Sequence, residues 1–237
     1  MRWFWLLAAA VLAGGCAKSP AGGALGAKRL TFTMTVAGQI KGSTPGDAPL
    51  VYIVALNFSD SLNPTTQGPL PVVAPPWGNG FVAGQCDYFI RWDPTASTGG
   101  YLLYQFDPND PTLINYTVIG TPVTYVQVPG GGNELQFSID MSQLGLPANT
   151  VNAFQSVQVN FLTMDRIPQG GDTGQKVLDS LGDNRTPNGI NENVTIPLNG
   201  SKGYGPDYGS FTDLEPEGDC SDPDLDIIDW SVQVQIQ

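Results

Sequence analysis

The chain has 237 residues, no histidine and a formal net charge of −12 at neutral pH. The acidic charge argues against binding to nucleic acid through its phosphates. The lack of histidine excludes the usual Ser-His-Asp and Cys-His nucleophiles and most catalytic zinc and non-haem iron sites. A glycosidase that uses only two carboxylates remains compatible with this composition.

Residues 1–15 are typical of a secretory signal peptide, with Arg2, an apolar run from Trp3 to Leu12, and small residues up to Gly15. The apolar run is too short for a membrane span, which needs about 20 residues. The stretch LAGGC, which ends at Cys16, resembles the lipobox of bacterial lipoproteins, although its leucine is one position farther from the cysteine than usual. The alternative is an ordinary signal peptide with an incidental cysteine.

The lipobox resemblance implies that Cys16 carries lipid chains such as palmitate and anchors an exported protein to the cell envelope. Residues 17–27 are small and flexible and are expected to form a tether, followed by one folded domain over residues 28–237. Ala17 differs from the aspartate that typically retains lipoproteins at an inner membrane. The outer membrane is therefore expected, if the host has one.

Alternation of apolar and polar residues predicts strands along the whole domain. The run at 50–58 is almost continuously apolar, which is typical of a central, buried strand. The other predicted strands cover residues 30–36, 86–92, 101–106, 113–119, 123–128, 134–140, 156–164 and 228–237. A helical turn is expected at 141–145. This pattern predicts an all-β fold, a single antiparallel β-sandwich with long Gly/Pro-rich loops at 59–80 and 166–193.

Tryptophan rings are candidates for ligand binding, because flat aromatic faces stack on sugar rings. Trp77 lies in the loop sequence PPWGNG, and Trp92 lies at the end of a predicted strand. The alternative for each of these two side chains is that it packs within the protein and does not contact a ligand. Trp230 follows the alternation of the last strand and is expected in the core.

Cys86 and Cys220 form an even pair in a chain that is expected to be exported, so a disulfide between them is predicted. The alternative is two separate buried thiols. The bond would pin the polar C-terminal loop to the strand at 86–92.

The C-terminal loop is rich in carboxylates, which repel one another unless they are neutralised. Calcium takes oxygen ligands, so this loop is a possible calcium site, although it lacks EF-hand spacing. Its candidate ligands are Asp213, Glu215, Glu217, Asp219, Asp222, Asp224 and Asp226. The alternative is a solvated acidic surface. Asp107 and Asp110, in DPNDP, are expected to be turn residues rather than an acid–base pair.

The stretch NELQFSIDMSQLGL and the following VQVNFLTMD resemble the later strands of DOMON-like domains and of family-nine carbohydrate-binding modules. The resemblance implies a β-sandwich whose ligand is carbohydrate or haem. Haem in such domains is often held by methionine and histidine, and this chain has no histidine, so carbohydrate is preferred.

The leading hypothesis is therefore a lipid-anchored, exported, non-catalytic module that binds carbohydrate. The first alternative is a structural or assembly lipoprotein of the envelope that contacts another protein. A glycoside hydrolase is the third hypothesis, and it requires two carboxylates that converge in one cleft.

Overall fold

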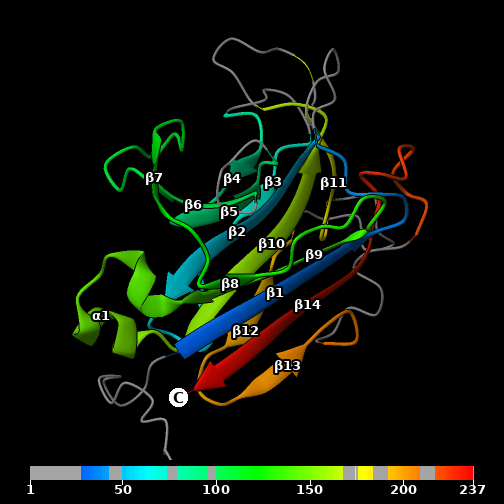
Figure 1. Ribbon diagram of the computed structural model, residues 1–237. Coiled ribbons are helices and arrows are strands. Elements are labelled where there is room, and N and C mark those ends of the chain that lie inside the picture. Colours follow the sequence, from blue (N-terminus) through cyan, green and yellow to red (C-terminus); the bar gives the residue numbers. More distant parts are fainter. Residues whose placement is uncertain are drawn as a thin grey trace, which may run out of the picture.

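The computed structural model describes residues 28–42, 50–73, 79–94, 100–167, 174, 176–183, 192–208 and 217–236. Within these residues two antiparallel sheets pack face to face, which confirms the predicted all-β sandwich (Figure 1). No helix in the described part of the chain is long and apolar enough to cross a membrane.

In the described residues the first sheet has five strands. In spatial order they are β13 (Lys202–Tyr204), β14 (Ile227–Ile236), β1 (Lys28–Val36), β9 (Glu134–Asp140) and β8 (Thr124–Tyr125). β1 pairs along its full length with β14 and along most of its length with β9. The N-terminal and C-terminal strands therefore lie side by side in the middle of this sheet (Figure 1).

The second sheet has seven strands in the described residues. In order they are β11 (Val177–Ser180), β10 (Ser156–Met164), β2 (Val51–Ser59), β5 (Tyr88–Trp92), β6 (Tyr101–Phe106) and β7 (Tyr116–Gly120), with β12 (Val194–Pro197) also paired to β10. β3 (Leu70–Pro71) and β4 (Val82–Ala83) form a separate two-stranded sheet, and Val82 packs in the apolar cluster on the outer face of the seven-stranded sheet. A 3-10 turn, η1 (Met141–Leu144), and a short helix, α1 (Ala148–Ala153), follow β9.

The main core fills the space between the two sheets. β1 contributes Leu30, Phe32, Met34 and Val36, which are all buried, while its threonines face outward and are half-buried. Trp230 on β14 is 1% exposed and packs against Phe161. The predictions that these residues share a core face and that Trp230 is a core residue are confirmed.

A second apolar cluster covers the outer face of the seven-stranded sheet. β2 shows why its sequence is continuously apolar: Val54 and Leu56 face the main core, and Ile53 and Ala55 face the second cluster. Phe81 is a member of the outer cluster and packs on the rings of Phe89 and Phe106. β2 is thus a central, buried strand, as its sequence predicts.

The outer face of β10 carries polar residues that hold the chain from 59 to 69. The Gln158 Nε2 donates to the carbonyl of Thr66 at 2.9 Å, and the Asn160 Nδ2 donates to the carbonyl of Pro69 at 3.2 Å. This loop was expected to be irregular, and side chains rather than strand pairing fix its path.

The structure corrects several predictions about secondary structure. The strand predicted at 113–119 begins at Tyr116, and β3 lies inside the loop predicted at 59–80. The strand predicted at 123–128 is shortened to Thr124 and Tyr125, flanked by backbone hydrogen bonds from Val123 and Val126 to β9. β11 lies inside the stretch 166–193 that was predicted to be irregular. It forms because three of its residues pair with the end of β10, a partner that its own short apolar run does not reveal.

Candidate functional site: a hollow at the end of the β5–β6 pair

A hollow of about 630 Å³ lies where β5 begins and β6 ends. These strands pair with Tyr88 opposite Gln105, so the segments 84–88 and 105–108 form one side of the hollow. The other side comes from the chain around α1, at Leu146, Thr150 and Phe154. Ligand pockets commonly have volumes of about 300–1,000 Å³, so this hollow is large enough for one or two sugar rings.

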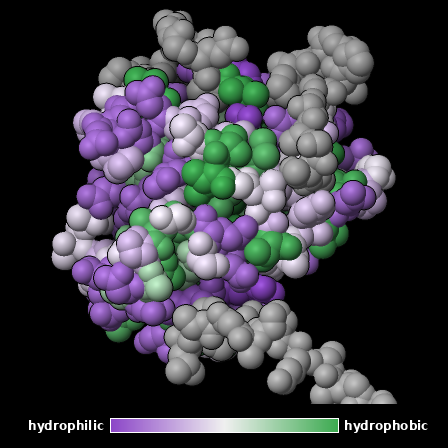
Figure 2. Space-filling view, turned by 60° about the vertical axis from the view of Figure 1, so that its left-hand side comes forward, coloured by the Kyte–Doolittle hydropathy of each residue, from purple (hydrophilic) through white to green (hydrophobic). Residues whose placement is uncertain are grey.

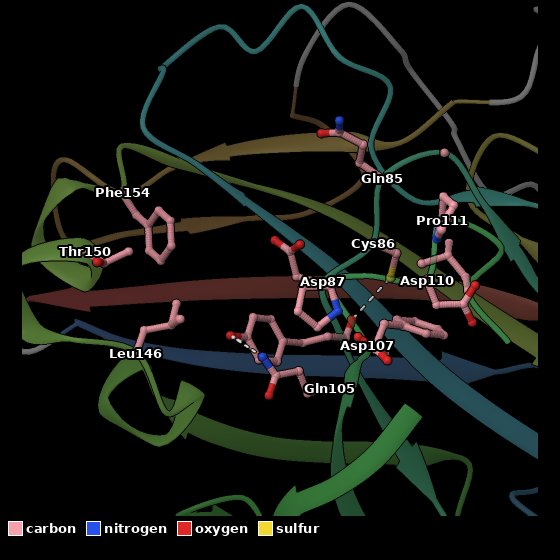
Figure 3. Close-up of a pocket in the computed structure, with 15 residues that line it drawn as sticks. Gln85, Cys86, Asp87, Gln105, Asp107, Asp110, Pro111, Leu146, Thr150 and Phe154 are labelled. Carbon is pink, nitrogen blue, oxygen red and sulfur yellow. Dashed lines mark hydrogen bonds between the residues drawn. The ribbon is translucent and has the colours of Figure 1, made fainter. Parts of the chain in front are cut away.

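Apolar side chains form the α1 side. Figure 3 shows Phe154, Thr150 and Leu146 together on one side of Asp87. The Phe154 ring stacks on Phe58, with centroids 5.2 Å apart, and Phe154 also lines the hollow. Phe154 is half-buried. Tyr88 and Phe106 also line the hollow but are buried, so Phe154 is the most exposed of its aromatic residues.

The facing side carries two aspartates that stabilise their own turns. The Asp110 carboxylate accepts hydrogen bonds from Thr112, Ile114 and Asn115, and those from Thr112 and Asn115 lower its pKa to about 2. Asp107 accepts from the backbone and side chain of Asn109. The prediction that both are turn residues is confirmed, and their oxygens are largely occupied.

Asp87 lies between these two sides (Figure 3). Its side chain is exposed to water, yet the walls of the hollow displace much of its hydration, and this desolvation raises its pKa. One oxygen accepts a long hydrogen bond, 3.3 Å, from the backbone N–H of Phe58. Asp87 therefore presents to the hollow a carboxylate that is only weakly engaged by the described residues.

Two amides complete the polar surface. The side chain of Gln85 is exposed and makes no hydrogen bond with any described residue, while its backbone N–H donates to Gln67. The Gln105 Nε2 donates to the Tyr88 hydroxyl at 3.4 Å, which leaves its Oε1 as an acceptor. Burial raises the pKa of Tyr88 to about 12, so its hydroxyl stays protonated and donates to the carbonyl of Leu144. The hollow thus combines an aromatic side with carboxylate and amide groups.

The structure does not support the prediction that Trp92 stacks on a ligand. Its ring is 8% exposed and packs edge-on against Tyr52, with centroids 5.8 Å apart. The next described residue after 94, Gly100, closes over it: a Cβ there would lie 2.6 Å from the indole nitrogen. Trp77 lies outside the described residues, so its predicted role remains a prediction.

The predicted disulfide is wrong: Cys86 and Cys220 are not bonded to each other. Cys86 belongs to the outer apolar cluster, whereas Cys220 belongs to the core between the sheets. The seven-stranded sheet separates these two clusters. The alternative, two separate buried thiols, describes the structure, and burial raises the pKa of Cys86 above its ordinary value.

β11 lies at the end of the sandwich opposite α1 (Figure 1). Three carboxylates converge around it. Asp179, Asp219 and Asp226, here called the acidic triad, each offer an oxygen within 4.8 Å of the others. Asp179 is fully buried and Asp226 is 2% exposed. Asp179 was missed by sequence reasoning, because β11 brings it to Asp219 from 40 residues earlier in the chain (219 − 179).

The triad also holds the local backbone. Asp179 accepts a 2.6 Å hydrogen bond from the N–H of Ile227, where β14 begins. Asp226 accepts from the N–H groups of Gly218 and Cys220. These bonds stabilise the carboxylates, so the segment is more than a solvated acidic surface.

The other predicted calcium ligands do not join the triad. Asp224 accepts from the N–H of Gln39 and forms an ion pair with Lys41, and these contacts lower its pKa although burial opposes the shift. Asp222 accepts from the N–H of Asp224, and Glu217 is exposed. Asp213 and Glu215 lie outside the described residues.

An apolar strip follows one edge of the molecule. Among the described residues, five of the seven exposed large apolar side chains lie between 114 and 126, on and beside β7 and β8: Ile114, Val118, Val123, Tyr125 and Val126. Figure 2, in which the side carrying β7 comes forward, shows apolar residues gathered among polar ones on this face. An exposed apolar strip is a candidate contact surface for another protein.

Sequence reasoning missed Asp87, Gln85, Gln105, Thr150 and Phe154 as candidate site residues. The one available signal was Asp87, the single acid in the apolar run CDYFIRW. Comparisons with family models, with curated proteins and with solved structures find no match for this chain.

Proposed function

We propose that this protein is an exported, lipid-anchored module that binds carbohydrate in the hollow at the end of the β5–β6 pair and catalyses no reaction. The observation that supports the proposal is the hollow itself, which combines the Phe154 ring with Asp87 and the amides of Gln85 and Gln105. Sugars present apolar ring faces together with hydroxyl groups, and such a lining complements both. The lipobox-like sequence at Cys16 supports the anchor.

The charges at the hollow favour binding over hydrolysis. A two-carboxylate hydrolase needs an acid and a second carboxylate that acts as nucleophile or base. Asp87, with its raised pKa, suits the acid, but Asp107 and Asp110 are engaged by their own turns. A thin-layer assay for cleaved oligosaccharide tests this directly, and product formation would contradict the binding proposal.

The binding test is a glycan screen with the full-length protein, followed by titration of the best glycan. Gln85→Ala is expected to weaken binding about two- to tenfold, since one hydrogen bond contributes roughly 0.5–1.5 kcal/mol. Gln127→Ala is the matched control, because Gln127 is exposed and does not line the hollow. Absence of binding to every glycan, or equal weakening by both variants, would overturn the proposal.

The second candidate function is a structural or assembly role in the cell envelope. It is favoured by the buried Trp92 and by the exposed apolar strip beside β7 and β8. The same screen separates the two functions. If no glycan binds, the strip becomes the surface on which to search for a protein partner.

We also propose that the acidic triad binds calcium. Three carboxylates this close together and largely buried repel one another, and a cation offsets that repulsion. Calcium takes about six to eight oxygen ligands, and carboxylates are its usual protein donors.

Calcium is expected to raise the unfolding temperature relative to chelator by several degrees. Saturation at 100 times the dissociation constant contributes about 2.7 kcal/mol, and each 1 kcal/mol shifts the midpoint by about 2–4 °C in a domain of this size. Asp219→Asn should remove the shift, whereas Glu217→Gln, an exposed neighbour outside the triad, should keep it. A midpoint that does not respond to calcium in the unsubstituted protein would disprove the site.

A further inference from the structure

The charged groups that line the hollow all have the same sign. Asp87, Asp107 and Asp110 face it, and none of the described lining residues is a lysine or an arginine. The Lys28 ammonium donates a hydrogen bond to the carbonyl of Phe154, but Lys28 is not among the lining residues. The net charge of −12 adds to the negative potential at this surface.

This charge arrangement discriminates between classes of glycan. Uronic acids and sulfated sugars would bring a second negative charge to Asp87, in a concave site where water screens the repulsion poorly. Neutral sugars could donate hydroxyl hydrogen bonds to the Asp87 carboxylate, which otherwise accepts only the long hydrogen bond from Phe58, but they would leave its negative charge without an opposite charge. An ammonium group would supply the missing opposite charge, and charge-assisted hydrogen bonds are about twice as strong as neutral ones.

We infer that the hollow selects glycans that carry a free primary amine, with Asp87 as the group that binds the ammonium. The inference rests on the proposed function and specifies its ligand class. The Phe154 ring contacts the apolar face of the sugar, and the amides of Gln85 and Gln105 bind its hydroxyl groups. Asp107 and Asp110 keep the hydrogen bonds within their own turns when the ligand binds, and they contribute negative potential to the hollow.

The expected result is an order of affinity in titration calorimetry with the full-length protein. Glucosamine oligosaccharides should bind at least about tenfold more tightly than N-acetylglucosamine oligosaccharides of the same length, because a charged hydrogen bond contributes roughly 1.5–3 kcal/mol. Galacturonate oligosaccharides should bind most weakly. The preference should decrease as salt is added, since ions screen the attraction.

Asp87→Asn tests the residue itself, because asparagine keeps the shape of the side chain and can still accept from the N–H of Phe58. It should remove the preference for the amine while leaving the affinity for the N-acetylated oligosaccharide within about twofold. Glu134→Gln is the matched control: it removes one negative charge from an exposed site on β9, outside the hollow. An equal loss in both variants would show a long-range charge effect and overturn the role of Asp87.

A folding readout separates loss of binding from loss of structure. The pKa of Asp87 is raised in the folded protein, so its ionisation at neutral pH opposes folding. Asp87→Asn should therefore leave the unfolding midpoint unchanged or raise it by at most about 2 °C. If Asp87→Asn lowers the unfolding temperature, the Asp87 carboxylate makes stabilising contacts in the folded protein. That result would contradict the observation on which the inference rests, that this carboxylate is only weakly engaged.

The remaining outcomes distinguish the inference from the proposed function. Equal affinity for amine and N-acetylated oligosaccharides overturns the inference and leaves carbohydrate binding intact. No binding to any oligosaccharide overturns both. Competition by a simple diamine as strong as that of the amino sugar would show that the ring and hydroxyl contacts contribute nothing, and this would also overturn the inference.

Discussion

Asn160→Asp is expected to destabilise the domain by about 3–5 kcal/mol at neutral pH, the range seen when a buried charge is left uncompensated. Asn160 is fully buried on β10, and its Nδ2 donates to three backbone carbonyls, those of Pro69, Leu181 and Glu192, at 2.9–3.2 Å. An amide nitrogen has two hydrogens, so one is shared between two carbonyls. Aspartate has nearly the same shape but directs a negative oxygen at all three acceptors.

The measurement is chemical denaturation as a function of pH. Burial raises the pKa of the introduced carboxyl, so the variant should recover part of the lost stability as the pH falls through that pKa. Asn152→Asp is the control: Asn152 is exposed on α1, and its substitution should change stability by less than about 0.5 kcal/mol. A loss below 1 kcal/mol for Asn160→Asp would show that the three loops do not depend on this amide.

Gly84→Ala should destabilise the fold by about 2–4 kcal/mol and abolish glycan binding, through a backbone effect alone. Gly84 has φ +74°, and a Cβ on it would lie 2.2 Å from the carbonyl oxygen of Gly68. The clash would separate the two chain segments that the hydrogen bond from the N–H of Gln85 to the carbonyl of Gln67, 2.9 Å, now joins. Gly84 and Gln85 both line the hollow, so the site would lose one side.

Gly145→Ala separates the two causes of this loss. Gly145 also has a positive φ, +69°, but no atom lies within 4 Å of the position of its Cβ. Alanine there should cost only the left-handed conformation, roughly 1–2 kcal/mol, and glycan binding should persist. If thermal unfolding and glycan titration give the same result for the two variants, the close approach at Gly84 is not what shapes the hollow.

The long strands could be predicted from the sequence because the burial of their residues follows the local pattern of apolar and polar positions. β6, β9 and β10 have the bounds that their apolar runs predict. The short strands could not be predicted in this way. β11 and β12 form because both pair with the edge of β10, and a run of four residues carries too little local signal to predict that pairing.

The candidate sites depend on contacts between distant parts of the chain. Asp87 meets Phe154 only because β5 and the segment after β9 come together at one end of the sandwich. Asp179 meets Asp226 only because β11 joins the seven-stranded sheet beside the start of β14. No characteristic spacing in the sequence signals either contact. Composition could therefore indicate an acidic region but could not identify the residues that form the site.

By itself the sequence determined the fold class, the core faces of the long strands, the turn roles of Asp107 and Asp110, and the core position of Trp230. Each of these depends on residues within a few positions of one another. The tertiary structure alone decided that Trp92 is buried, that Cys86 and Cys220 lie in separate apolar clusters, and that one hollow combines an aromatic ring with a desolvated carboxylate. The physical reason is that burial, pKa and ligand geometry are set by neighbours in space, and in this sandwich those neighbours are mostly far apart in sequence.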